Sequence, residues 1–268
     1  MDYVSVIKLG GPVSLVVNLV DDYTGDGCND GDLTVFLDGV RNKPERKRNG
    51  SFVFRDLSEP SCRVIVRGDR FLEESFTVNL DDLDPKSPVV PVSLKPATTY
   101  QFRKHSPVIR VTVVDQNGDP LPDVTIQAVL TSDECARARV GSPGAEPGDQ
   151  QISVVDITGK IASGDEYRFN TRDGEELGTA MILAPGESEG AYRLTAPLAN
   201  PLPRGCLLMP LLKSRTNRKG EAVFGFRNLY QKTCGVRLRF TLGDQVMERE
   251  GVLEEATTWG LGTIRFPD

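Results

Sequence analysis

The sequence predicts an all-β protein made of two related modules, the second of which carries a large insertion. Two observations lead to this prediction. Short runs of alternating apolar and polar residues, rich in Val, Ile, Thr and Phe, are separated by Gly, Pro, Asp and Asn, and two stretches of the chain recur later in the same order. Period-two runs at short spacing are typical of packed β-sheets, whereas helical periodicity is scarce.

The alternating runs define the strands that we expect in the two modules. Each run has the length of an ordinary strand and is bounded by residues that favour turns. The expected strands are residues 13–20, 33–37, 51–54, 63–66, 75–80, 108–114, 124–130 and 237–242.

The repeat becomes visible when the chain is compared with itself. Residues 19–36 (LVDDYTGDGCNDGDLTVF) match residues 113–128 (VVDQNGDPLPDVTIQA), and residues 50–66 match residues 220–240. In the second pair a Gly opens a strand containing Val-Phe, and a Cys, Cys62 or Cys234, leads into the next strand. Two matches in the same order indicate two copies of one β-module.

The copies differ in length at one place. The chain needs roughly 75 more residues from Asp115 to Gly220 than from Asp21 to Gly50, which is far beyond an ordinary connection. We therefore predict a first module at residues 1–97, a linker at 98–107, and a second module at 108–268 with an insertion at about 131–212.

The insertion contains strand-like runs of its own, at residues 152–157, 166–170, 179–183 and 191–195. Its last part, residues 196–212 (APLANPLPRGCLLMPLL), is apolar and rich in proline. Two interpretations stay open for this part: an irregular strand that covers an open sheet edge, or a docking surface for a partner.

Charge and hydropathy narrow the class of protein. Lys and Arg total 32 and Asp and Glu total 38, which gives a formal net charge of -6 and no general attraction to nucleic acid or anionic lipid. No apolar run reaches the roughly 20 residues of a membrane span or forms a signal-peptide core at the N-terminus. We expect a protein that is cytoplasmic at synthesis, that does not insert into membranes, and that can join a larger particle.

The five cysteines are widely separated, and none lies in a C-x-x-C pair. Neither a zinc site nor a disulfide framework is indicated, so reduced, buried thiols are the simplest expectation. A pairing of Cys62 with Cys234 is formally possible.

The quoted motifs resemble a known family. The pattern V-x-D-x-x-G-x-P-L-x-D-V-x-I that ends at Ile126, together with T-N-R-K-G-E-A-V-F at 216–224 and G-S-F-V-F-R-D-L at 50–57, is similar to transthyretin-like modules called carboxypeptidase regulatory-like domains. The resemblance implies two tandem immunoglobulin-like sandwiches. It also implies a non-catalytic role in spacing or docking, including association with phage-tail-like contractile particles, and it leaves the insertion unexplained.

An aspartate-rich loop is the candidate cation site. Neither register of an EF-hand fits, because position twelve falls on Leu33 or Leu37 instead of a bidentate Glu. A non-helical calcium loop and a solvated turn both stay open, and calcium is the one cofactor considered. The candidate ligands are Asp21, Asp22, Asp26, Asp30 and Asp32.

Two basic loops precede the Val-Phe strands at equivalent positions of the copies. Long basic side chains are usually solvated, but here they are candidates for docking on an acidic surface of another subunit, such as the aspartate-rich loop. The candidate partner-binding residues are Arg41, Lys43, Arg46, Lys47, Arg48, Lys213, Arg215, Arg218 and Lys219, together with the single tryptophan, Trp259.

The parts of a catalytic site are nearly absent from the sequence. His105 is the only histidine and lies in the predicted linker, and no G-x-S-x-G, H-E-x-x-H, Walker or Rossmann pattern is present. We therefore expect a non-enzymatic structural or protein-binding component of an assembly that binds protein partners or itself. The alternative is a carbohydrate- or calcium-dependent binding module that uses Trp259 or the aspartate-rich loop.

Overall fold

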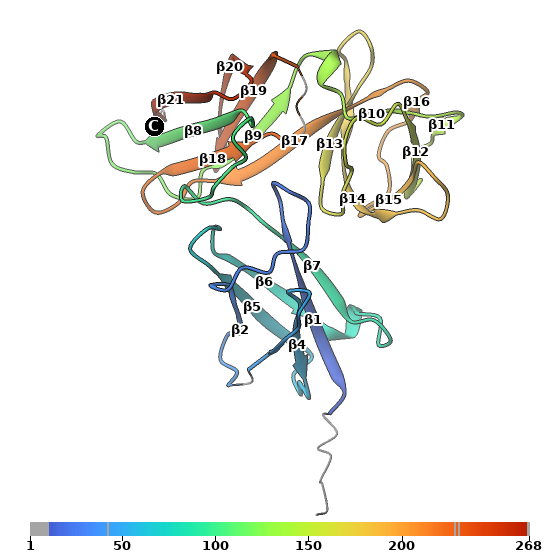
Figure 1. Cartoon of the computed structure of the whole chain (residues 1–268), viewed down its shortest axis with the longest axis vertical. Helices are drawn as coiled ribbons and strands as arrows, with labels where there is room; N and C mark the ends of the chain where they lie inside the picture. The colour runs from blue at the N-terminus through green and yellow to red at the C-terminus, as the bar shows by residue number, and fades with distance from the viewer. Residues whose placement is uncertain (1–10, 42, 228, 230, 267–268) are drawn as a thin grey trace, which may run out of the picture. The chain divides into compact units, whose positions relative to one another are not determined.

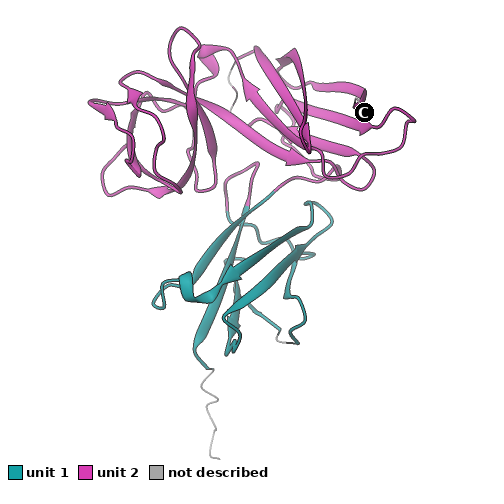
Figure 2. Cartoon of the chain, turned by 180° about the vertical axis from the view of Figure 1, so that it is seen from behind, with its two compact units in different colours: residues 1–20, 27–94 teal, residues 21–26, 95–268 magenta. Residues whose placement is uncertain are grey.

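The structure is a computed structural model that describes residues 11–41, 43–227, 229 and 231–266. It is all-β: the helical elements among these residues are two short 3₁₀ turns, η1 (Leu80–Asp82) and η2 (Asp133–Cys135). Within the same residues, no helix has the length and apolar character needed to cross a lipid bilayer. The chain divides into unit 1, residues 1–20 and 27–94, and unit 2, residues 21–26 and 95–268 (Figure 2).

Unit 1 contains two sheets. The first has the order β3-β4-β1-β7, formed by β3 (Glu45–Arg46), β4 (Phe52–Arg55), β1 (Val13–Asp21) and β7 (Val89–Leu94). The second has the order β2-β5-β6, formed by β2 (Thr34–Leu37), β5 (Ser61–Arg67) and β6 (Glu74–Asn79). Alternation on β1 buries Leu15, Val17 and Leu19 completely, as a period-two strand with one face in a core requires.

Unit 2 contains a second pair of sheets that share one hydrophobic core. One has the order β18-β8-β21, formed by β18 (Glu221–Gly225), β8 (Val108–Val114) and β21 (Thr258–Arg265). The other includes β9-β19-β20, formed by β9 (Thr125–Leu130), β19 (Thr233–Leu242) and β20 (Gln245–Glu254). Ile109, Ile126 and Phe240, from β8, β9 and β19, are fully buried in this core, so the arrangement is of the β-sandwich type.

The two units use their strands in the same order. Sheet β4-β1-β7 of unit 1 corresponds to β18-β8-β21 of unit 2, and β2-β5-β6 corresponds to β9-β19-β20, when strands are matched by chain order (Figure 1). The predicted strands at residues 13–20, 33–37, 108–114 and 124–130 are confirmed to within one residue at each end. Copy one adds the short β3 next to β4, and copy two adds the whole insertion.

The insertion forms a closed sheet of six antiparallel strands. Its order is β10-β12-β15-β14-β13-β17, and a further pairing of β10 with β17 closes the ring. Ile152, Phe169 and Leu208 are among the residues of its own core, and the two-stranded sheet β11-β16 accompanies it. The elements are β10 (Ala138–Val140), β11 (Gly144–Ala145), β12 (Gln151–Val155), β13 (Glu166–Asn170), β14 (Glu176–Pro185), β15 (Ala191–Leu194), β16 (Leu202–Pro203) and β17 (Leu207–Arg215).

Strand β17 joins the insertion to the sandwich. Its first half, from Leu207 to Leu211, pairs with β13, and its second half, from Leu211 to Arg215, pairs with β9. The proline-rich segment 196–212 therefore ends in a central strand, and the docking-surface interpretation is wrong for Leu207 and Leu208, which are fully buried. Pro210 lies just before the first pair between β17 and β9, so the missing N–H of the proline removes no hydrogen bond to β9.

The cysteines correct the expectation of five reduced thiols. Cys135, shortly after β9, forms a disulfide with Cys234 at the start of β19. The formal pairing of Cys62 with Cys234 is therefore wrong. Cys28, Cys62 and Cys206 lie outside this disulfide and are buried, in line with the expected small apolar role.

Candidate functional site

The aspartate-rich loop is divided between the two units. Asp21, Asp22 and Asp26 belong to unit 2, whereas Asp30 and Asp32 belong to unit 1. The five predicted ligands therefore do not belong to one unit. Among the residues that the structure describes, no group of three or more His, Cys, Asp or Glu side chains is arranged to hold a metal ion.

The three aspartates of unit 2 have partners in the protein. The Asp21 carboxylate is buried and accepts hydrogen bonds from the backbone N–H of Tyr23 at 2.9 Å and from the hydroxyl of Tyr100 at 2.5 Å. Asp22 pairs with Lys95 at 2.6 Å, and Asp26 pairs with Lys160 at 2.6 Å. These carboxylates are compensated by hydrogen-bond donors and cations, so a bound calcium ion would have to displace existing bonds.

The other two aspartates are held within unit 1. Asp30 pairs with Arg70 at 2.8 Å, and Asp32 accepts a hydrogen bond from the N–H of Asp69 at 2.8 Å. Arg46 donates to the carbonyl oxygen of Asp30 and, at 3.2 Å, to the side-chain oxygen of Asn29. A contact between a basic residue and the aspartate-rich loop thus occurs inside one chain, and the predicted docking on another subunit stays a prediction.

The basic loops are only partly available to a partner. Lys47 pairs with Glu45, Lys213 pairs with Glu166, and Arg215 also has a partner. The carbonyl oxygen of Arg48 accepts a hydrogen bond from the Asn29 side chain at 3.0 Å. The exposed members of the predicted set are Arg41, Lys43, Arg48, Arg218 and Lys219, and docking by these residues stays a prediction.

Trp259 lies on β21 and is partly buried against the core of the unit 2 sandwich. Its ring covers Gly251 of β20 so closely that a Cβ at Gly251 would lie 2.3 Å from ring atoms. The indole face is therefore used for packing, which differs from the open aromatic platform that stacks on sugar rings.

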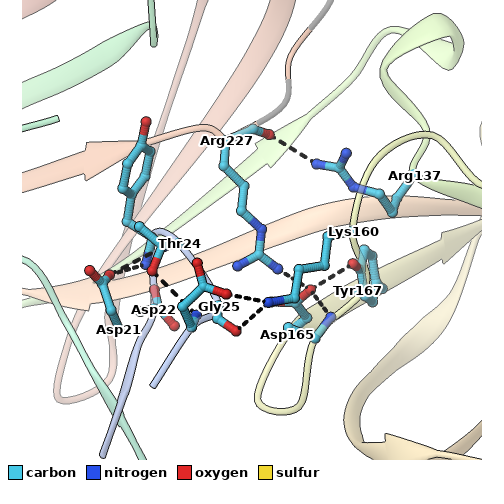
Figure 3. Close-up of polar contacts among 12 residues, drawn as sticks. Asp21, Asp22, Thr24, Gly25, Arg137, Lys160, Asp165, Tyr167 and Arg227 are labelled. Carbon is cyan, nitrogen blue, oxygen red and sulfur yellow. Dashed lines mark hydrogen bonds and ion pairs between the residues drawn. The ribbon is translucent and has the colours of Figure 1, made fainter. Parts of the chain in front are cut away.

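A cleft of unit 2, with a volume of about 50 Å³, contains a buried polar cluster that the sequence did not indicate (Figure 3). The Oδ2 atom of Asp165 accepts hydrogen bonds from the N–H of Ala162 at 2.8 Å and from the Tyr167 hydroxyl at 3.0 Å, and it forms an ion pair with Arg227. Arg137 donates to the carbonyl oxygens of Thr158 and Arg227.

Glycine conformation allows this cluster to form. Gly25 has a φ of +67°, and a Cβ at this position would lie 2.3 Å from Nη1 of Arg227 and 2.8 Å from the side chain of Ala162. Only a residue without a side chain lets the guanidinium pack this closely.

The cluster is suited to structure rather than to proton transfer. Burial raises the pKa of Tyr167 far above its ordinary value, and the neighbouring Asp165 charge raises it further, so the phenol stays protonated and acts as a donor. His105 is exposed and is not among the residues that line the cleft. Within the described lining, we find no nucleophile hydrogen-bonded to a general base.

A second polar feature lies on the open face of the sheet β14-β13-β17-β9-β19-β20. Cross-strand pairs place Arg168 beside Met209, and the next row on this face contains Glu166, Leu211, Val129 and Arg237. A pocket of about 80 Å³ opens on this face. Its lining includes Arg168, Arg237, Arg239, Glu176, Glu248 and Gln127.

Sequence reasoning missed this pocket because its residues come from strands far apart in the chain. Arg168 lies in the run EYRFN, which is recognisable only as a strand. The available signal is the placement of an arginine among residues that are otherwise buried, with Tyr167 and Phe169 on either side, but side-chain alternation alone assigns such an arginine to solvent.

Comparison with known proteins gives weak similarities. No family model matches the chain, and no curated protein matches it. Among solved structures, a streptococcal ancillary pilin has 12% sequence identity and a TM-score of 0.27, and the match covers 94% of this chain and 68% of that chain. The shaft pilin SpaA from Lactobacillus rhamnosus GG has 7% identity and a TM-score of 0.26 over 96% of this chain and 97% of the pilin. Similarities at this level assign neither a fold nor a function to the chain.

Proposed function

We propose that this chain is a non-enzymatic protein-binding component of a larger assembly. The observation that carries the proposal is the open face of the sheet β14-β13-β17-β9-β19-β20. This face presents the apolar side chains of Met181, Val246 and Val252, which are 39%, 46% and 59% exposed, around the arginines of the pocket. Exposed apolar residues combined with arginine are typical of protein interfaces.

The size of the face is sufficient for a specific interface. Six neighbouring strands span about 24 Å, because adjacent strands lie ~4.8 Å apart. A standard interface buries about 800 Å² on each partner, which a face of this width and the length of the ten-residue β20 can supply. The occupant that we propose is a second protein subunit of the same assembly.

The polar cluster of the cleft supports the non-enzymatic part of the proposal. Asp165 is engaged by three donors, and Arg137 by two carbonyl oxygens. These bonds stabilise the connection between segments of unit 2, and breaking one of them to bind a substrate would leave a buried charge unpaired.

We also propose that the two units are diverged transthyretin-like modules, related to carboxypeptidase regulatory-like domains, in a tandem immunoglobulin-like arrangement. The common strand order of the two units supports this proposal. Under it, the assembly is a phage-tail-like contractile particle whose subunits are made in the cytoplasm. Neighbouring genes for sheath, tube or baseplate proteins are the observation that tests this part.

Size-exclusion chromatography with light scattering tests the binding role. At low and at high salt we expect self-association or a co-purifying subunit, which the double variant Val246→Asp/Val252→Asp weakens. The matched control is Arg249→Asp on the same strand. Arg249 pairs with Leu238, whereas its chain neighbours Glu248 and Glu250 pair with the pocket residues Arg239 and Arg237, so Arg249 belongs to the other face of the sheet. A strict monomer without a co-purifying protein at either salt concentration contradicts the proposal.

A further inference from the structure

Arg168 is a buried cation with too few hydrogen bonds. Its side chain is 10% exposed, and its hydrogen bond within the described residues is one of 3.5 Å to Glu176. Its Nε atom is buried without a partner. A guanidinium has five N–H donors, and buried donors are normally satisfied by protein or water. Burial lowers the pKa of Arg168, as expected for a desolvated cation.

The pocket beside Arg168 offers space and further donors. Its volume of about 80 Å³ accommodates a small ligand or a side-chain end, and Arg237 and Arg239 of β19 line it together with Gln127 of β9. Arg237 is held by Glu250 at 2.7 Å, outside the pocket lining. The residue that most needs an acceptor is therefore Arg168, and two further guanidinium groups stand around the same space.

The charges of the lining select among possible anions. Arg168, Arg237 and Arg239 contribute three positive charges, whereas Glu176 and Glu248 contribute two negative charges. Glu250 offsets Arg237 from outside the lining, so the charges around the pocket balance without a ligand, and what Arg168 lacks is a hydrogen-bond acceptor rather than a counter-charge. A dianion such as hydrogen phosphate would be repelled by the two glutamates of the pocket lining.

We propose that the pocket at Arg168, Arg237 and Arg239 is a binding site for one carboxylate group. A carboxylate carries a single charge and has two oxygens in one plane, the geometry that a guanidinium binds with two parallel hydrogen bonds. The carboxylate comes either from a free small acid or from a Glu or Asp side chain of another protein. The inference does not depend on the proposed assembly function, because a small acid tests it directly.

The site has a consequence for stability. A buried cation without sufficient partners destabilises the unoccupied protein, and apolar replacement of such groups is often neutral or stabilising. Arg168→Met is therefore expected to raise the urea midpoint of unfolding while it removes carboxylate binding. A purely structural arginine gives the opposite result, a lower midpoint.

Titration with sodium acetate, followed by NMR, tests the site in the full chain. Sodium chloride at the same ionic strength is the reference, and the probes are the Nε–Hε signal of Arg168 and the methyl signals of Val129 and Leu211. We expect saturable shifts with acetate beyond those with chloride. Arg239→Ala weakens binding about tenfold, the effect of losing one charge-assisted hydrogen bond, and Arg168→Met abolishes the methyl shifts. Arg249→Ala is the matched control and leaves them unchanged.

Further arms identify the source and the class of anion. Phosphate at pH 8 is expected to bind more weakly than acetate. A blocked Gly-Glu-Gly peptide that binds better than acetate, with no binding of the Gly-Gln-Gly peptide, identifies a protein side chain as the source, whereas binding of acetate alone identifies a free acid. Absence of any shift beyond the chloride reference, or tighter binding of phosphate, overturns the proposal.

Discussion

The sandwich of unit 1 and the sandwich of unit 2 differ most at one connection. In unit 1 the chain runs from β2 to β4 through the two-residue strand β3, and β2 stays at the edge of its sheet. In unit 2 the equivalent connection, from β9 to β18, contains the closed six-stranded sheet, and its last strand β17 pairs with β9. One framework therefore tolerates a long insertion where the insertion covers an open sheet edge, because such an edge exposes backbone donors and acceptors.

The equivalent cysteines differ in the same way. Cys62 at the start of β5 is a free, buried thiol, whereas Cys234 at the start of β19 is bonded to Cys135. The bonded residues are 99 positions apart and enclose the insertion. A crosslink of this length restricts the unfolded chain strongly, so the insertion is accompanied by a device that unit 1 does not need.

Removal of this disulfide is the change with the largest expected effect. For Cys135→Ala/Cys234→Ala we expect a loss of about 5 kcal/mol in the free energy of unfolding of unit 2, the loop-entropy value for such a loop. Urea denaturation monitored by the fluorescence of Trp259, the only tryptophan, measures it. Cys62→Ala is the matched variant of unit 1 and removes only a small apolar group, for about 1 kcal/mol. Equal stability of oxidised and reduced wild-type protein would contradict this expectation.

Two equivalent glycines test the similarity of the units. Gly50 and Gly220 precede β4 and β18, with φ of +85° and +72°. A Cβ would lie 2.3 Å from the carbonyl oxygen of Cys28 at Gly50, and 2.3 Å from that of Val113 at Gly220. Because the clash is with backbone and the conformation is left-handed, we expect Gly50→Ala and Gly220→Ala each to destabilise by about 2–4 kcal/mol.

The effect of each glycine variant should be confined to its own unit. Hydrogen exchange of β1 and β8 reports on the two units separately. Gly39→Ala and Gly118→Ala are the matched controls, since both glycines have positive φ but a Cβ at either position would meet no atom within 4 Å, and the expected loss is about 1 kcal/mol. If Gly50→Ala and Gly220→Ala cost as little stability as the controls, the close contact of these glycines with backbone carbonyl oxygens is not required.

The equivalent turn aspartates test a difference between the copies. Asp21 is 8% exposed and accepts bonds from two backbone N–H groups and from Tyr100. Asp115 accepts a backbone N–H from Asp119 at 2.8 Å in an exposed turn. Asp21→Ala leaves the buried Tyr100 hydroxyl without this acceptor, so we expect a loss of about 2–3 kcal/mol, against about 1 kcal/mol for Asp115→Ala. Thermal unfolding compares the two variants, and equal losses would remove the distinction.

Alternation predicted the strands well where one face of the strand is buried. The run at residues 166–170 coincides with β13, whereas β20 was not predicted, because Glu248, Arg249 and Glu250 interrupt its apolar pattern. Strand β17 was not recognised as central, since proline normally marks edges and turns. The first half of β17 pairs with β13 and the second half pairs with β9. These pairings depend on residues far away in the sequence, and they put β17 in the middle of the sheet.

The candidate sites were less predictable than the strands. The loop sequence shows five aspartates close together, but the chain directs Asp26 and Asp32 into different units with different partners. The disulfide was out of reach because five cysteines allow many pairings and their spacing selects none. Arg168 is a candidate site because it is buried, and the sequence of a strand does not show that one of its arginines is buried.

The smallest expected effect concerns Asp26 of copy one, which pairs with Lys160 of the insertion. Its pKa is lowered by the hydrogen bond from Lys160 and by the charge of that lysine. Both side chains are well exposed, 62% for Asp26 and 49% for Lys160, so solvent screens the pair and Asp26→Asn should cost about 0.5 kcal/mol or less. Because the folded-state pKa is lowered, the contribution is present above the unfolded-state pKa of about 3.9 and is lost as the pH falls through the folded-state value.

Urea denaturation of the wild type and Asp26→Asn at pH 7 and at pH 3, in low and high salt, measures the difference. It should shrink at low pH and in high salt, and a difference that persists in both would mean that Asp26 acts through something other than its charge, such as a bound cation.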